Sequence, residues 1–119
     1  MYLFRPAGSN YIAVLDLTAS ASWYAEKFGL RPNTTKFDDG QKGVELTLSE
    51  EVFFVLGPPG LPADPDTPML YTARIQKARD LLISRGVTVG PIQRDRQNTR
   101  FFEIRDLENN VTEIVDEPC

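Results

Sequence analysis

The sequence predicts an α+β fold made of two tandem βαβββ modules, which combine into a cup-shaped mixed sheet with the helices outside. Two observations lead to this prediction. One helix pattern followed by several strand patterns occurs twice, and a proline-rich segment separates the two copies. Corresponding landmarks, such as the helix-ending glycines Gly29 and Gly86, keep similar positions within each copy.

The length of 119 residues is typical of one domain. We therefore expect a single domain over residues 1–119. Within it, module one covers about residues 9–56, the linker residues 57–68, and module two about residues 69–116. The linker sequence GPPGLPADPDTP contains too much proline and glycine for a helix or a central strand.

Module one begins with a strand pattern and continues into an amphipathic helix. Leu17, Ala21, Tyr24 and Phe28 recur at spacings of four, three and four, which places them on one helix face. Asp16 or Thr18 is suited to cap this helix, and Gly29 follows its last turn. The strands expected in this module are residues 11–16, 32–37, 43–48 and 51–56.

Module two repeats this order. Ile75, Ala78, Leu81 and Leu82 mark one face of its helix, which we expect to end at Gly86. Residues 90–98 have no clear periodicity and are predicted to be a loop or an irregular edge of the sheet. The strands expected in this module are residues 69–73, 87–89, 99–104 and 111–115, the last two joined by a turn over residues 106–110.

Composition excludes several kinds of function. The net charge is −4, from 13 basic and 17 acidic residues, and no basic stripe suggests nucleic-acid binding. The sequence has no long apolar run, so we expect neither a membrane span nor a secretory signal. The single cysteine is compatible with the cytoplasm. The chain has no histidine, which excludes Ser-His-Asp and Cys-His catalysis and removes the commonest zinc ligand.

Three stretches resemble the vicinal oxygen chelate superfamily, which includes glyoxalase I, extradiol dioxygenases and the fosfomycin and bleomycin resistance proteins. They are AVLDLTASASWYAEKFGL, ARIQKARDLLISRGVTV and FFEIRDLENNVTEIV. The third is similar to a closing hairpin whose turn usually contains proline and glycine. Leu107 and Asn109 replace these two residues here, and asparagine tolerates the left-handed backbone that such turns require.

The resemblance also implies where a metal would bind. In metal-dependent members, a glutamate at the place of Glu113 binds the ion together with three other positions. By the same register those positions are Ser9, Phe54 and Thr67, and a slip of one residue offers Asn10, Val55 or Asp66. Asp66 and Glu45 are further carboxylates that a different register would offer. One carboxylate with weak hydroxyl donors does not hold zinc, iron or nickel, so we expect no metal and no other cofactor.

Bleomycin resistance proteins, as known members of this superfamily, lack the metal site, form dimers and hold a cationic aromatic drug. The resemblance therefore implies a cytoplasmic homodimer that binds a small organic molecule, aromatic or cationic, in the cup. Aromatic faces and carboxylates suit such a ligand. The candidate ligand-binding residues are Phe54, Tyr71, Phe101, Glu103 and Glu113.

Glu113 leaves alternatives open. It is a ligand-binding carboxylate, or it pairs with Arg100 or Arg105 as a remnant of a lost metal site. Its pKa should rise in a closed apolar cup and fall beside an arginine. The alternative function is a metal-dependent lyase, isomerase or dioxygenase that uses Glu113 with an atypical ligand set, or a metal-free enzyme with Glu113 as its base. A third option is a regulatory module whose cup is filled by its own side chains.

Overall fold

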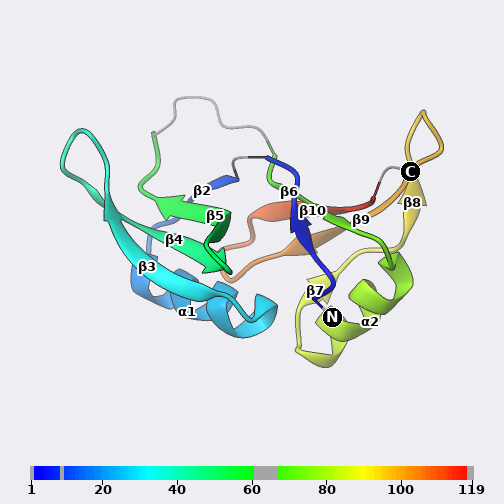
Figure 1. Ribbon diagram of the computed structural model, residues 1–119. Helices are drawn as coiled ribbons and strands as arrows, with labels where there is room; N and C mark the ends of the chain where they lie inside the picture. The colour runs from blue at the N-terminus through cyan, green and yellow to red at the C-terminus, as the bar shows by residue number, and fades with distance from the viewer. Residues whose placement is uncertain (1, 9, 61–66, 118–119) are drawn as a thin grey trace.

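The computed structural model describes residues 2–8, 10–60 and 67–117. In chain order its elements are β1 (Arg5–Pro6), β2 (Tyr11–Ala13), α1 (Leu17–Phe28), β3 (Arg31–Lys36), β4 (Lys42–Leu48), β5 (Glu51–Gly57), β6 (Met69–Thr72), α2 (Ile75–Ser84), β7 (Thr88–Val89), β8 (Gln93–Arg94), β9 (Arg100–Arg105) and β10 (Val111–Asp116). Both helices lie on one side of the strands, and the β3–β4 hairpin and the β8–β9 turn extend on the other (Figure 1). The predicted α+β fold with external helices is confirmed.

The two sheets have the same strand arrangement. In the first, the order is β2-β5-β4-β3, and in the second it is β6-β10-β9-β7, with β1 added beside β6 and β8 beside β9. In both, the first strand of the module runs parallel to the last, and the remaining pairs are antiparallel. This repetition is what a duplicated βαβββ unit produces.

Backbone hydrogen bonds fix how the two copies correspond. The N–H of Glu113 donates to the carbonyl of Pro68 at 2.9 Å, and the N–H of Val55 donates to the carbonyl of Asn10 at 2.8 Å. Glu113 also lies opposite Glu103, as Val55 lies opposite Glu45. Val55 is therefore the counterpart of Glu113 in module one.

The helices confirm the caps expected from the sequence. Asp16 caps α1, since its side chain accepts a hydrogen bond from the N–H of Ala19 at 3.0 Å. Gly29 ends α1 in the left-handed conformation at φ 66°. Gly86 follows the last turn of α2 at φ 81°. Asn109 is also left-handed, at φ 68°, as its replacement of glycine in the closing turn predicts.

Three short elements differ from the prediction. The first strand of module one ends at Ala13 because the N–H groups of Leu15 and Asp16 bind a side chain of module two. Two strands of two residues each, β1 and β8, lie in segments that were not predicted to form strands. Both exist through pairing with a distant strand, β1 with β6 and β8 with β9.

A bulge in β5 buries two successive phenylalanines. Leu46 pairs with Phe54 and Thr47 with Val52, so Phe53 is the extra residue. Phe54 is 0% exposed and packs against the rings of Tyr24 and Phe28 in α1. Phe53 is buried as well and contacts the ring of Tyr2. Phe54, a candidate ligand-binding residue of the cup, therefore lies in the core under α1 instead.

Two polar groups hold the modules together. The buried side chain of Asn10 donates to the carbonyls of Phe53 and Met69, both at 2.9 Å, and accepts from the N–H of Met69 at 3.0 Å. The carboxylate of Glu108 accepts from the N–H groups of Leu15 and Asp16, each at 2.8 Å. The Asn10 bonds set the start of β6 beside the start of β2, and the Glu108 bonds set the turn before β10 against the start of α1. No helix in the described part of the chain is long and apolar enough to cross a membrane.

Candidate functional site

A pocket of about 460 Å³ opens where the end of β2 meets β9 and β10. We call it the acidic pocket, because the side chains of Glu103 and Glu113 line one part of it. Tyr11 and Ala13 of β2 line another part, and Thr67 and Asn110 supply further polar groups. The pocket therefore combines residues from both modules.

The two glutamates are direct cross-strand neighbours. Glu113 pairs with Glu103 in the antiparallel β9–β10 ladder. The N–H of Glu113 donates to the carbonyl of Pro68, and the carbonyl of Glu103 accepts from the N–H of Gly90 at 2.8 Å. The backbone groups of Glu113 and Glu103 therefore point away from each other and do not bond across the β9–β10 pair. At such non-hydrogen-bonded positions the side chains are closest, with Cβ atoms about 4.5–5.5 Å apart. Two carboxylates thus lie side by side in one pocket.

Electrostatics disfavour the ionised form of Glu113. Partial burial raises the pKa of its carboxyl above the usual range, and the charges of Glu103 and Asp95 raise it further. Neither candidate arginine offsets this effect: Arg100 binds Asp116 at 2.7 Å, and Arg105 donates to the carbonyl of Asn109. Within residues 2–8, 10–60 and 67–117, no ion pair includes Glu103 or Glu113.

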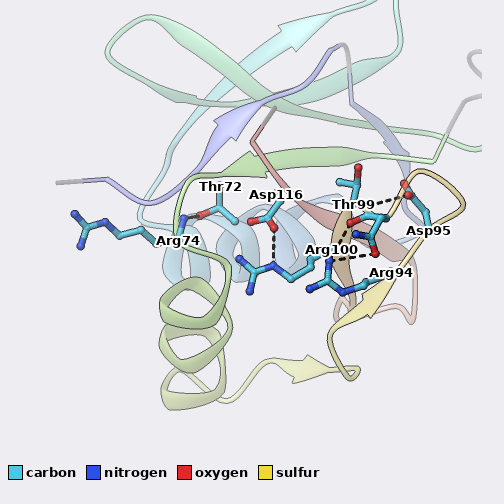
Figure 2. A network of polar contacts seen from close by, with 8 residues as sticks. Thr72, Arg74, Arg94, Asp95, Thr99, Arg100 and Asp116 are labelled. Carbon is cyan, nitrogen blue, oxygen red and sulfur yellow. Dashed lines mark hydrogen bonds and ion pairs between the residues drawn. The ribbon is translucent and has the colours of Figure 1, made fainter. Parts of the chain in front are cut away.

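Asp95 belongs to the turn between β8 and β9. Its Oδ1 accepts from the N–H groups of Gln97 and Thr99, at 2.8 and 3.0 Å, which fixes the carboxylate on this turn. Figure 2 shows this turn beside the Arg100–Asp116 ion pair, where β9 begins and β10 ends. Asp95 thus adds negative charge near the two glutamates from a rigid position.

A second pocket, of about 660 Å³, continues along the same sheet face. Met69, which pairs with Glu113, lines it together with Tyr71 and Val115. Phe101 pairs with Val115 and is half-buried. The guanidinium of Arg5 lies 5.4 Å from the centre of the Tyr71 ring, so one side of that ring already contacts a cation.

Module one fills much of its own sheet face. An added Cβ at Gly43 would lie 2.6 Å from the ring of Phe37 and 2.7 Å from the carbonyl oxygen of Leu56, and one at Gly57 would also meet the Phe37 ring. The absence of side chains at these glycines therefore lets Phe37 lie flat on the sheet. Its ring is 6.0 Å from that of Tyr11, whose hydroxyl donates to the carbonyl of Pro58 at 2.6 Å. Tyr11 is thus held in place at the edge of the acidic pocket.

Among the described residues at the expected metal positions, Glu113 supplies the one carboxylate, which by itself does not fit a divalent ion. Ser9 and Asp66 lie outside the described residues. Phe54 lies under α1, and Val55, the alternative to Phe54 if the register shifts by one residue, is apolar. Asn10 is fully committed to the Phe53 and Met69 backbone. Thr67 and Glu113 do meet in the acidic pocket. In the described part of the chain, no three His, Cys, Asp or Glu side chains converge as metal ligands.

The structure brings together some of the predicted site residues and not others. Glu103 and Glu113 share the acidic pocket, and Tyr71 lines the second pocket. Phe101 lies on the same sheet face, but Phe54 does not reach the cup. Tyr11 and Asp95 were not identified from the sequence. Tyr11 was identifiable from the repeat, since it occupies the position of Met69 in the other module.

Comparison with known proteins supports the fold. No protein-family model and no curated protein matches the chain. A member of the glyoxalase/bleomycin resistance protein/dioxygenase superfamily from Sphaerobacter thermophilus has a similar structure, with 23% identity, a TM-score of 0.70 and coverage of 93% of this chain and 98% of that chain. TnmS3, an antibiotic binding protein from a Streptomyces species, has 17% identity, a TM-score of 0.69 and coverage of 94% and 97%. Lactoylglutathione lyase from Agrobacterium tumefaciens has 19% identity, a TM-score of 0.66 and coverage of 93% and 94%. The resemblance identified from the sequence is therefore confirmed for the fold.

Proposed function

We propose that this protein is a metal-free binding protein for a small organic cation with a flat apolar body. The observation that supports this most directly is the Glu103–Glu113 pair, which faces a pocket without a cationic partner among the described residues. Two neighbouring carboxylates repel each other, and a bound cation replaces that repulsion with attraction. The apolar parts of the pocket suit the body of such a ligand.

The arrangement around the pair favours an aromatic cation. Tyr11 presents a ring at the edge of the acidic pocket, where a cation can contact both the ring and the carboxylates. The adjoining pocket, with Met69 and Val115, offers apolar surface for the rest of the molecule. Each of the two pockets by itself has a volume in the range of drug-sized ligands. TnmS3, an antibiotic binding protein of similar structure, is consistent with this use of the fold.

Affinity for the cation should depend on pH. Glu113 has a raised pKa, so a larger fraction of it is protonated in mildly acidic solution than for an ordinary glutamate. Protonation removes one of the two negative charges that attract the ligand. Binding should therefore strengthen as pH rises through the raised pKa of Glu113.

A thermal-shift screen tests this proposal. Paired compounds that differ only in charge, such as 1-naphthylmethylamine and 1-naphthalenemethanol, are compared at neutral pH, with the chain and with Glu113→Gln. The cation should raise the melting temperature of the unmodified chain more than the alcohol does, and Glu113→Gln should reduce this difference. Equal shifts for both compounds would contradict the proposal.

The same assay tests the competing metal-dependent enzyme. Nickel, manganese and zinc are titrated in place of the organic compounds. We expect no saturable increase in melting temperature that Glu113→Gln abolishes. Such an increase would favour a metal-dependent lyase, isomerase or dioxygenase instead.

Two further parts of the proposal are a homodimer and a location in the cytoplasm. Size-exclusion chromatography with light scattering tests the homodimer, and fractionation of cells tests the location.

A further inference from the structure

A groove of about 700 Å³ runs between the N-terminal segment and α2, and it shares no lining residue with the acidic pocket. Its apolar part consists of Tyr2, Leu3, Phe4 and Leu81. Tyr2 is 37% exposed, a high value for a large ring. Its hydroxyl donates to the carbonyl of Phe28 at 2.6 Å, which holds the N-terminal segment in place. We call this feature the α2 groove.

Three cations lie along the same groove. Lys77 lies within α2, Arg74 and Arg85 flank its two ends, and all three line the groove together with Leu81. Arg85 is anchored, since its Nη1 donates to the carbonyl of Lys27 at 2.6 Å. Within residues 2–8, 10–60 and 67–117, none of the three forms an ion pair.

The charge of the α2 groove is opposite to that of the whole chain. The groove has three cations and one carboxylate, Asp80, whose Oδ1 accepts from Gln76. The whole chain has a net charge of −4. The N-terminal end of α2, where Arg74 and Lys77 lie, is the positive end of the helix dipole and favours negative charge. The first turn of α2 contains no acidic residue that would offset this effect. A partly exposed apolar floor beside cations that form no ion pair among the described residues is complementary to an anion with an apolar body.

We propose that the α2 groove binds a small amphiphilic anion, with a carboxylate head near Arg74 and Lys77 and an apolar chain along Leu3, Phe4 and Leu81. The volume of the groove suits a single small molecule. The negative net charge disfavours an anionic membrane surface as the partner. This site is independent of the proposed cation pocket, because the two differ in lining residues and in the charge they attract.

Calorimetric titration with decanoate tests this proposal, with decanol and decylamine as neutral and cationic counterparts. Decanoate should bind saturably, more tightly than either counterpart, and its affinity should fall as salt is added. Replacing both exposed cations, as Arg74→Glu with Lys77→Glu, should weaken binding by about tenfold or more. Lys36→Glu with Lys42→Glu changes the net charge equally on β3 and β4 and should leave the affinity unchanged.

Several results would overturn the proposal. These are no saturable decanoate binding, equal affinity for decanol, or the same affinity in the α2 variant and its control. A melting curve of each variant shows whether it folds. If the double glutamate variant does not fold, Arg74→Gln with Lys77→Gln replaces it, and unchanged decanoate affinity in that variant would also overturn the proposal. A self-associated chain that binds no decanoate would assign the groove to a second copy instead.

Discussion

Glu113 is a carboxylate whose ionisation opposes folding. Burial and the nearby charges of Glu103 and Asp95 raise its pKa, so the folded chain binds this proton more tightly than the unfolded chain does. Stability from this group is therefore present at low pH and is lost as pH rises through the raised pKa. This sign is opposite to that of a glutamate in a salt bridge.

Replacing Glu113 with glutamine should therefore stabilise the chain at neutral pH. We expect a gain of about 0.5 kcal/mol, the size of one like-charge cross-strand pair. The gain should disappear in acid, where the glutamate is protonated. Urea unfolding at several pH values measures both effects. Glu45→Gln, at the position in module one that corresponds to Glu103, is the matched control and should change stability less.

Asn10 is a structural residue and not a ligand-binding one. Its buried amide makes three hydrogen bonds to the backbone of two strands from different modules. Asn10→Ala should lower the free energy of unfolding by about 2–3 kcal/mol, because buried backbone groups lose their partners. The exposed Asn33, which donates to Thr47 at 2.9 Å, is the comparison. Asn33→Ala should cost less than about 0.5 kcal/mol, and equal losses would contradict this role of Asn10.

At the scale of elements, the helices were predicted more completely than the strands. Apolar periodicity and a left-handed glycine define α1 within its own sequence, so its ends are local information. The strands β1 and β8 have two residues each and form only through pairing with distant strands. No local pattern indicates such pairing. The bulge at Phe53 is also non-local, and it was not anticipated when the register of the resemblance placed Phe54 in the cup.

The hairpin of β3 and β4 depends on two small residues under Phe37. Gly43→Ala should destabilise the chain by about 1–3 kcal/mol, since the added methyl group would overlap the Phe37 ring and the carbonyl oxygen of Leu56. Gly8 has open space at its Cβ position and serves as the control. Gly8→Ala should change stability by no more than about 0.5 kcal/mol. Thermal unfolding of the two variants measures the difference.

At the scale of the whole molecule, the closing turn joins module two to the start of α1. Glu108 accepts two backbone hydrogen bonds at this junction, and these bonds hold the pKa of its carboxyl below the usual range. Its contribution to stability is therefore present above the ordinary pKa of glutamate and is lost as pH falls through the lowered value. Asp106 supports the same turn by accepting from the hydroxyl of Tyr24 at 2.6 Å.

Glu108→Gln should weaken this junction. The amide can accept at one oxygen only and has no charge, so we expect a loss of about 1–2 kcal/mol at neutral pH. The loss should become smaller in acid, where the glutamate is itself protonated. Glu50→Gln, at an exposed position of the β4–β5 turn, should have little effect at any pH. A loss for Glu108→Gln that is independent of pH would contradict the role of its charge.

The cup itself was predicted in part. The resemblance placed Glu113 in the cup and Glu103 was a further candidate, and the pairing of β9 with β10 puts both on one sheet face beside β2. Tyr11 and Asp95 join them only through the contact between modules and through the turn after β8. Such positions depend on how elements pack in three dimensions, and one sequence does not specify that packing by local pattern alone.

The most direct test of the proposed cation site is a calorimetric titration of 1-naphthylmethylamine and 1-naphthalenemethanol into the chain and into the Glu103→Gln, Glu113→Gln double variant. We predict that the unmodified chain binds the cation about tenfold or more tightly than the alcohol at neutral pH, and that the double variant loses this preference. A preference that survives in the double variant, or that never exists in the unmodified chain, would contradict the assignment of the acidic pocket to an organic cation.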